Sequence, residues 1–340
     1  MTNPKLNQWY LDFLEKDRKN VVESLFYFLL WFFSRIYGAG VFLRNFLYQR
    51  KIIPGFISQA KVISIGNLSW SGSGKTSLSI WLYERLSSKY KAAVLRRGYG
   101  DDEGKLLKER VNDVFSAPSR SKLAKELEHT FNLFILDDGF QHRSLCRDID
   151  IVIMGSRDFR RKYRLIPAYF FREPLSALKR ADILLLNYKE EIKDKEALRE
   201  TIREIAPGLG VYFSQYKSKG FLDLAGNKFA VDFLKGRRLG AAAAIGYPQG
   251  FFNKLAELDL NLVRKIVYPD HHELSITEFR NLEDSLISKG INDLVITHKD
   301  KYHFPSLESR LNIFILEVEL EIEDELRFLT EIKDRLAGVK

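Results

Sequence analysis

The chain has 340 residues, enough for about two domains with a substantial core. Its 54 lysines and arginines exceed its 45 aspartates and glutamates, and the net charge of +9 favours an anionic partner such as nucleic acid, acidic lipid or a phosphorylated substrate, or simply aids solubility. The single cysteine, Cys146, excludes an internal disulfide framework and is typical of proteins from a reducing compartment.

An apolar, aromatic segment follows the polar N-terminal lead. Its uncharged stretches, 24–34 and 36–43, are separated by Arg35, and every charged residue from 24 to 60 is basic. Neither stretch reaches the roughly 20 residues that a membrane-spanning helix needs, and an arginine within a span is costly. The pattern favours a helix lying in a membrane surface. A buried core helix and a spanning helix stay open, because periodicity alone does not separate the three.

The motif GNLSWSGSGKT at 66–76 ends as a Walker A phosphate-binding loop does, G-x-x-x-x-G-K-[ST]. Ser69 stands where the first glycine of that pattern belongs. The β-branched run at 61–65 predicts a buried strand before the loop, and the apolar spacing of 78–86 predicts a helix after it. Strand, glycine-rich turn and helix form the setting that a phosphate loop requires.

This setting assigns chemistry to the last residues of the loop. Gly72 and Gly74 allow backbone N–H groups to surround phosphate oxygens at the start of a helix. Lys75 reaches the β- and γ-phosphates, and the hydroxyl of Thr76 binds Mg²⁺. The alternative is a flexible turn in which Thr76 only caps the helix.

Strands and helices alternate from residue 61 onward, which predicts an α/β fold with a parallel sheet covered on both faces. The expected strands lie within 91–97, 131–138, 148–154, 181–187, 239–246, 293–298 and 312–318, and the expected helices within 121–131, 195–205, 251–259 and 275–290.

Pro207 and its neighbouring glycines interrupt the alternation. The sequence therefore predicts three parts: an N-terminal membrane-associating helical segment at 1–55, a P-loop core with a three-layer parallel sheet at 56–206, and a smaller C-terminal α/β domain at 207–340.

The strand expected before 137 ends in two carboxylates, Asp137 and Asp138, followed by Gly139. In phosphate-loop proteins the strand beside the loop ends in a Walker B aspartate that holds Mg²⁺ directly or through water. The pair therefore indicates a metal site, with a plain turn as the alternative.

Two further polar clusters are less specific. Asp101, Asp102 and Glu103 follow an expected strand and, from the residues alone, favour a solvated loop. His271 lies in a Y-P-D-H-H-E-L stretch that is more often a polar turn than a metal site. A carboxylate and an imidazole from separate loops could form a base dyad, but spacing does not show that they meet.

A basic, aromatic segment spans 156–180. The alternatives for it are a solvated loop and a site for an anion or a lipid headgroup. Its cations include Arg157, Arg160, Arg161, Lys162, Arg164 and Arg172.

Together these motifs closely resemble the tetraacyldisaccharide 4′-kinase family, the lipid A 4′-kinases. The matching pieces are IGNLSWSGSGKT, LRRGYG, DDGFQH with RDIDIVI, LIPAYFFREPLSALKRAD, AIGYPQGFF, YPDHHELS and ITHKD, whose order covers most of the chain. In that family the phosphate loop usually opens with threonine or serine, so Ser69 fits. The resemblance implies transfer of the γ-phosphoryl of ATP, with Mg²⁺, to the 4′-hydroxyl of a tetraacylated glucosamine disaccharide 1-phosphate, which forms lipid IVA. It places the enzyme at the cytoplasmic face of the inner membrane, peripheral or monotopic.

The resemblance also implies roles for single residues. The implied catalytic residues are Asp102 as the base, His271 as its support, and Lys75. Those implied at the nucleotide are Ser69, Ser71, Gly72, Ser73, Gly74, Lys75, Thr76 and Arg172, and those implied at the metal are Thr76, Asp137, Asp138 and Glu173.

This chain departs from the family at a few positions. The stretch between G-Y-G and the acidic pair is shortened, so Asp101 remains an alternative base to Asp102. Ser71 stands where glycine is usual, and the late T-E-K-D motif reads T-H-K-D at 297–300.

Two other classes of function compete with this reading. A membrane-associated P-loop ATPase or GTPase switch would usually carry N-K-x-D to read guanine, which 297–300 does not match. A nucleic-acid-binding protein would carry a recognisable module, and none is apparent. We therefore expect a lipid substrate and a membrane surface as partners, with no nucleic acid and no stable protein partner.

Overall fold

The computed structural model describes residues 10, 13–14, 16, 20–69, 73–98, 102–160, 164–188, 192, 194–270, 272–305 and 307–338, with only the backbone for Arg157 and Arg160. The chain forms two compact units. The larger unit comprises Leu14–Gln215 and Leu320–Lys340, and the smaller comprises Met1–Phe13 and Tyr216–Glu319.

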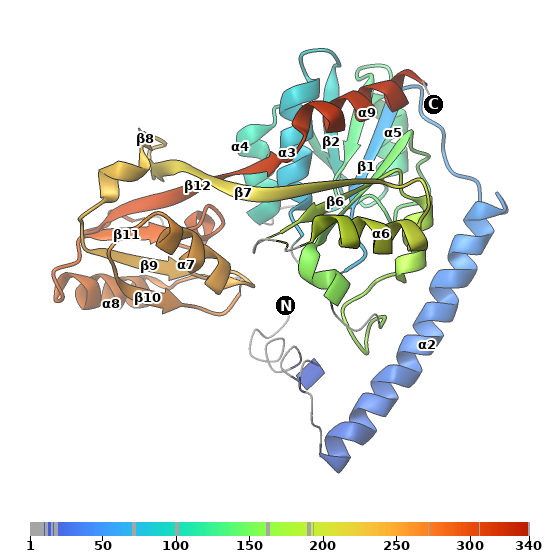
Figure 1. Ribbon diagram of the computed structural model, residues 1–340. Helices are drawn as coiled ribbons and strands as arrows, with labels where there is room; N and C mark the ends of the chain where they lie inside the picture. Colours follow the sequence, from blue (N-terminus) through green and yellow to red (C-terminus); the bar gives the residue numbers. More distant parts are fainter. Residues whose placement is uncertain are drawn as a thin grey trace. The chain divides into compact units, whose positions relative to one another are not determined.

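The larger unit is built on a parallel sheet with the order β3-β2-β4-β1-β5-β6-β7 (Figure 1). Nearly every residue of its central strands is buried, which is typical of a parallel sheet covered on both faces. The strands are β1 (Lys61–Gly66), β2 (Ala92–Arg96), β3 (Val114–Ser116), β4 (Leu133–Leu136), β5 (Ile149–Gly155), β6 (Ile183–Asn187) and β7 (Gly210–Asp223).

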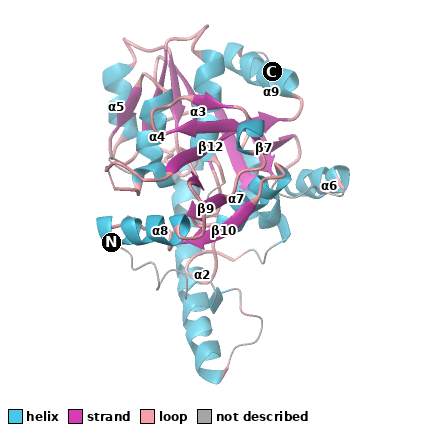
Figure 2. Ribbon diagram, turned by 90° about the vertical axis from the view of Figure 1, so that its left-hand side faces the viewer, coloured by secondary structure: helices cyan, strands magenta, loops and turns pink. Residues whose placement is uncertain are grey.

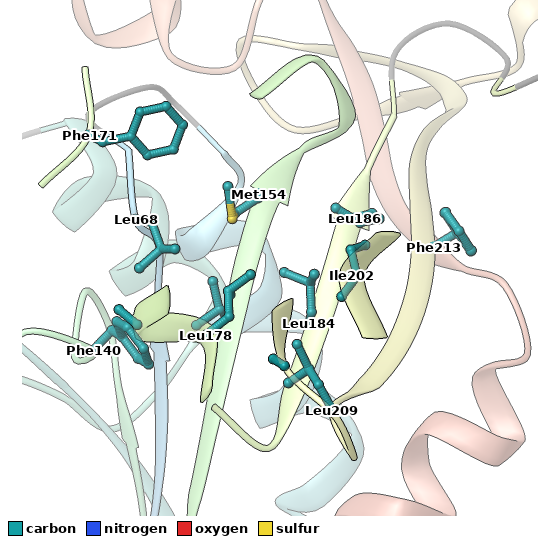
Figure 3. Close-up of a cluster of buried hydrophobic side chains, with 13 residues drawn as sticks. Leu68, Phe140, Met154, Phe171, Leu178, Leu184, Leu186, Ile202, Leu209 and Phe213 are labelled. Atoms are coloured by element: carbon teal, nitrogen blue, oxygen red, sulfur yellow. The ribbon is translucent and has the colours of Figure 1, made fainter. Parts of the chain in front are cut away.

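Helices cover both faces of this sheet. Their bounds, with 3₁₀ helices labelled η, are α3 (Lys75–Leu86), α4 (Asp102–Arg110), α5 (Arg120–Leu127), η1 (Ser156–Arg160), η2 (Leu175–Arg180), α6 (Lys195–Ile205) and α9 (Glu325–Ala337). On one face, Met154 and Leu184 pack with Ile202 of α6, as Figure 3 shows. On the other face α3 and α9 meet, because the Phe328 ring lies 5.6 Å from that of Trp81. The three-layer P-loop fold is thus confirmed.

The helix α2 (Val21–Gln49) is one uninterrupted helix of 29 residues (Figure 1). It begins at a capping box. The Asn20 side chain accepts from the Glu23 N–H, and the Glu23 carboxylate accepts from the Asn20 N–H. By length and composition the helix is long and apolar enough to cross a membrane, and its most apolar stretch is only 11% buried. Only Ser34 and Val41 of this helix are buried. The helix is thus apolar and largely exposed, which argues against the alternative of a buried core helix.

The smaller unit is a second α/β sandwich of its own. Its parallel strands follow the order β10-β9-β11-β12, with helices on opposite faces. Phe252 of α7 packs on one face with Ala241 and Phe314, and Phe279 of α8 packs on the other with Ala242. The elements are β8 (Lys228–Phe229, antiparallel to β7), η3 (Val231–Leu234), β9 (Leu239–Ala243), α7 (Pro248–Glu257), β10 (Leu262–Val267), α8 (Ile276–Ile287), β11 (Asp293–Ile296), η4 (Asp300–Tyr302) and β12 (Asn312–Ile322).

Each strand and helix expected from the alternation is present, while α4 stands where the acidic residues after 100 indicated a loop. Figure 2 shows the helices and strands in a second view. The compact units also differ from the predicted ranges. The segment α2 belongs to the larger unit, and the chain passes out of that unit along β7 and back along β12. The last helix, α9, therefore completes the larger unit and not the smaller one.

Candidate active site

The phosphate loop joins β1 to α3. Its last residue, Gly74, adopts the left-handed conformation with φ 96° and caps α3, whose first residue is Lys75. A non-glycine residue would be strained there. Ser73 and Thr76 are buried, with 3% and 7% of their surface exposed. The backbone N–H groups and the positive end of the α3 dipole thus lie at the end of the loop, an arrangement suited to a phosphate.

Ser69 has a structural partner inside the protein. Its hydroxyl donates to Oδ2 of Asp158 over 3.0 Å, and the same oxygen accepts from the Gly155 N–H over 3.3 Å. Further along the loop, the Asn67 amide donates to the Ser73 hydroxyl over 3.0 Å. The serine side chain thus ties the start of the loop to η1, which a glycine at this position could not do. A nucleotide contact by Ser69 stays a prediction.

The two carboxylates after β4 lie beside the loop, because β4 pairs with β1. The turn that carries them packs closely on β1, where the Gly139 N–H donates to the Ile65 carbonyl over 2.7 Å. A Cβ at Gly66 would come within 2.4 Å of the Phe140 Cβ, so this approach requires glycine.

Asp137 and Asp138 have different electrostatic surroundings. Burial, with Glu103 adding to it, raises the pKa of Asp137 to about 6, and the Ser79 hydroxyl lies 3.2 Å from its Oδ1. Burial would also raise the pKa of Asp138, but Lys75 and Arg172 hold it below its ordinary value. Asp138 thus remains charged, whereas at Asp137 the charges of Lys75 and Arg96 do not outweigh burial and the charge of Glu103.

Two cations pair with Asp138. Arg172 donates to both carboxylate oxygens over 3.1 Å, and the Lys75 ammonium lies 3.7 Å from Oδ1. The loop lysine, the second Walker B carboxylate and the arginine of the F-R-E-P motif are therefore brought together, as the sequence predicted. These are also the groups that could exchange partners when a phosphate and a cation bind.

Asp102 is the first residue of α4. Its neighbour Glu103 is close enough to raise the pKa of Asp137. The acidic pair expected near the active site is therefore at its edge and is not a remote solvated loop. The role of Asp102 as a base stays a prediction.

Glu173 is fully buried, and its carboxylate already has several partners. Arg180 donates to its two oxygens over 2.7 and 2.8 Å, and the Asn45 amide donates to Oε2 over 2.7 Å. Burial alone would raise the pKa of Glu173, but the hydrogen bonds and charge of Arg180 hold it below its ordinary value. The assignment of Glu173 to the metal stays a prediction.

Three residues at the site were not singled out from the sequence. Arg120 donates to the backbone carbonyls of Asp137 and Asp138 over 3.1 and 2.8 Å, and burial lowers its pKa. Gln141 donates to the Asn67 carbonyl over 2.9 Å. Burial, followed by the charge of Arg120, lowers the pKa of His142 to about 4, so this imidazole is neutral at pH 7. Gln141 and His142 belong to the D-D-G-F-Q-H run, but nothing in the sequence marks Arg120.

The residues present fit Mg²⁺. No group of three or more His, Cys, Asp or Glu that could hold a metal lies within the described part of the chain. Magnesium beside a nucleotide needs fewer protein ligands, because phosphate oxygens and water complete its octahedron. The hydroxyl of Thr76 with Asp137 and Asp138 supplies such a set of hard oxygen donors.

Several predicted residues lie outside the described residues: Ser71, Gly72, Asp101 and His271. On either side of His271, Asp270 and His272 belong to the smaller unit, and the His272 ring lies 3.1 Å from Glu278 and stacks on Tyr268. The dyad of Asp102 and His271 therefore stays a prediction. In the basic segment, Arg164 stacks over the ring of Tyr27 on α2.

The raised pKa of Asp137 predicts a specific dependence of stability on pH without nucleotide and metal. The folded state keeps a proton that the unfolded chain has lost, so this stabilisation is complete below about pH 4 and is lost as the pH rises through about 6. The side chain of Asp137→Asn cannot ionise. We therefore expect its free energy of unfolding, relative to that of the wild type, to rise by about 2–3 kcal/mol as the pH increases from 4 to 7.5. Urea unfolding in EDTA measures this difference. The exposed Asp259→Asn is the control, and a pH-independent offset for Asp137→Asn would contradict the expectation.

Known proteins match this chain over most of its length. The model of the family described as tetraacyldisaccharide-1-P 4′-kinase (LpxK) matches residues 26–105 and 100–337. A tetraacyldisaccharide 4′-kinase from Anaeromyxobacter dehalogenans is 31% identical over 319 residues, which cover 84% of each chain. Another, from Vibrio cholerae, is 32% identical over 295 residues, covering 80% of this chain and 81% of the relative. The two ranges of the family match meet at 100–105, where the shortened segment was expected.

A solved structure of this kind also matches. The crystal structure of an "apo" form of LpxK from Aquifex aeolicus in complex with ATP superimposes with a TM-score of 0.72 at 26% identity. The match covers 89% of this chain and 97% of that one.

Proposed function

The chain belongs to the tetraacyldisaccharide 4′-kinase family, a family of phosphotransferases in lipid A biosynthesis, and from that premise we propose how its residues carry the reaction. ATP supplies the γ-phosphoryl group, and the 4′-hydroxyl of a tetraacylated glucosamine disaccharide 1-phosphate accepts it, which gives lipid IVA. The observation that carries the proposal is the cluster of Lys75, Asp138 and Arg172 at the first turn of α3. It combines a phosphate-binding helix end with mobile cations and with carboxylates suited to a metal.

The chemistry places modest demands on the protein. Phosphoryl transfer passes through a loose transition state, so catalysis consists of alignment and charge neutralisation. Lys75 and Arg172, released from Asp138, would offset negative charge on the transferred oxygens. Thr76, Asp137 and Asp138 would hold Mg²⁺, which would help to neutralise the negative charge that develops on the phosphate oxygens.

The acceptor hydroxyl needs a base. Asp102 at the start of α4 would take its proton as attack proceeds, and His271 would orient that carboxylate. Asp101 is the alternative base. The carboxylates of the Walker B pair, Asp137 and Asp138, are left for the cation.

The helix α2 supports a position on the membrane. Its C-terminal half is held to the protein by polar contacts of Ser34, Tyr37 and Asn45, so that half does not lie free in a hydrocarbon core. The remaining part, 21–33, rises about 20 Å, less than the roughly 30 Å of a bilayer core. This geometry supports a monotopic helix. We place it at the cytoplasmic face of the inner membrane, with the acyl chains of the substrate remaining partly in the bilayer.

Exposed apolar residues of α2 should therefore determine binding to lipid. Leu25 and Phe42 are 63% and 72% exposed. We expect the double variant L25E/F42E to bind phosphatidylglycerol vesicles about 100-fold more weakly, because two apolar side chains no longer leave water. Co-sedimentation measures binding, with the exposed Gln49→Glu on the same helix as a control for charge. Unchanged binding of L25E/F42E would contradict the monotopic placement.

The function itself is tested with γ-labelled ATP, Mg²⁺ and a detergent-dispersed tetraacyldisaccharide 1-phosphate. Label should appear in the lipid and depend on that acceptor. Release of labelled phosphate at the same rate without acceptor, and none in lipid, would favour the rival ATPase or GTPase switch.

A further inference from the structure

The buried carboxylate of Glu173 joins α2 to the body of the larger unit. It accepts the amide of Asn45 on α2 and both guanidinium N–H groups of Arg180, and Arg44 of the same helix lies 3.7 Å away. The Arg180 guanidinium also stacks on the Phe140 ring, 3.8 Å from its centroid. Since the carboxylate has no exposed surface, these partners replace its hydration.

Other polar contacts of α2 reach the same short segment, 164–173. The Ser34 hydroxyl donates to the Leu165 carbonyl over 2.8 Å, and the Tyr37 hydroxyl donates to the Arg172 carbonyl over 3.0 Å. The spacing of 34, 37, 41 and 45 puts these residues on one face of the helix. That face is therefore a polar attachment to one segment, whereas the rest of the helix is largely exposed.

The segment reaches the phosphate loop on its other side. The Arg172 N–H donates to the Leu68 carbonyl over 2.7 Å, and its guanidinium holds Asp138. One continuous set of contacts thus runs from α2 through Glu173 and Arg172 to Asp138.

We propose that Glu173 is a positioning residue that fastens α2 to the segment carrying Arg172, so that the seating of the membrane helix and the geometry of Arg172 at Asp138 depend on each other. This inference rests on the proposed role of Arg172 and Asp138 at the nucleotide. It differs from a metal role, because a ligand needs lone pairs directed at the ion, and the Glu173 oxygens already accept from Arg180 and Asn45.

The test compares Glu173→Gln with Asn45→Ala and Tyr37→Phe, which leave Glu173 intact and change only α2. Hydrogen exchange of the nucleotide-free protein in detergent is measured for 34–49 and 164–173. Kinase assays then give kcat and the Mg²⁺ concentration for half-maximal rate. The exposed Gln49→Ala on the same helix is the control.

We expect faster exchange in both segments for all three variants. We also expect kcat to fall about 10- to 100-fold, the effect of a displaced positioning group, with the Mg²⁺ requirement unchanged. Gln49→Ala should match the wild type in each measurement.

The proposal is overturned if Glu173→Gln raises the Mg²⁺ requirement about tenfold or more while Asn45→Ala and Tyr37→Phe behave as wild type. That result would make Glu173 a metal ligand. If Glu173→Gln does not fold, the two α2 variants alone decide, and wild-type exchange in both would overturn the proposal. Failure of the proposed function is distinguishable, because the wild type would then not label the lipid, whereas exchange is read without nucleotide.

Discussion

Replacing Lys75 with alanine is expected to lower kcat about 100- to 1,000-fold, the usual effect of removing one preorganised group that stabilises transition-state charge. Lys75 opens α3 with 14% of its side chain exposed and lies 3.7 Å from Asp138. Its ammonium is therefore largely buried, and it would exchange Asp138 for a phosphate oxygen when nucleotide binds. Alanine keeps the helix and removes only the charge.

The measurement is the rate of lipid labelling at saturating ATP, with calorimetry for ATP binding. Lys333→Ala, at an exposed position of α9, is the matched control for a lost positive charge. If Lys75→Ala works at the wild-type rate, the phosphate loop is not part of the active site, and the proposal is wrong.

The second large effect is expected for Asp102→Ala, a fall in kcat of about 100- to 10,000-fold, which is the range for loss of a general base. Asp102 begins α4, and the next residue, Glu103, influences Asp137 directly. A base at this helix end would adjoin the carboxylates proposed to hold the metal. Asp101→Ala should have a milder effect.

The pH dependence of kcat distinguishes a base from a structural residue. The wild-type rate should fall at acid pH as the base is protonated, and Asp102→Ala should lose that limb. If Asp101→Ala has the larger effect and loses the acid limb, the assignment moves to Asp101. Wild-type rates for both variants would contradict this part of the mechanism.

Most strands of both units could be predicted because they are continuous apolar runs bounded by polar residues, whereas β3, β7, β8 and β10 were not expected. The run at 183–187 is one example, and all five of its residues are buried in β6. A strand buried on both faces leaves such a record in the sequence, since no position in it can be polar without a partner.

Two helices were missed for different reasons. The sequence of α4, DEGKLLKER, has only two large apolar residues and resembles a solvated loop, although its acidic first turn and basic last turn suit a helix dipole. The helix α9 was not among the expected helices, and its residues were assigned to the smaller domain. Amphipathic spacing shows that one face of a helix is buried, but it does not show which surface that face packs on. Phe328 packs on Trp81 and Tyr212, which are distant from it in sequence.

The residues of the site also differ in this way: some could be predicted from local sequence, and others depend on contacts with distant parts of the chain. Lys75, Thr76 and the Walker B pair could be proposed because each lies in a short motif with local geometry. The partners of Glu173 could not be, since Asn45 lies 128 residues away in sequence. Arg120 likewise reaches the Asp138 carbonyl only through the folding of α5 against β4.

The return of the chain along β12 has a consequence for synthesis. Trp81 and Tyr212 are synthesised before the smaller unit, but Phe328, whose ring packs on both, is synthesised only after it. The smaller unit is therefore a long insertion that has to be translated before the nucleotide-binding unit can close its apolar face. A nascent chain that stops before α9 would leave this aromatic surface exposed, and exposed apolar surface makes an incomplete chain prone to aggregation.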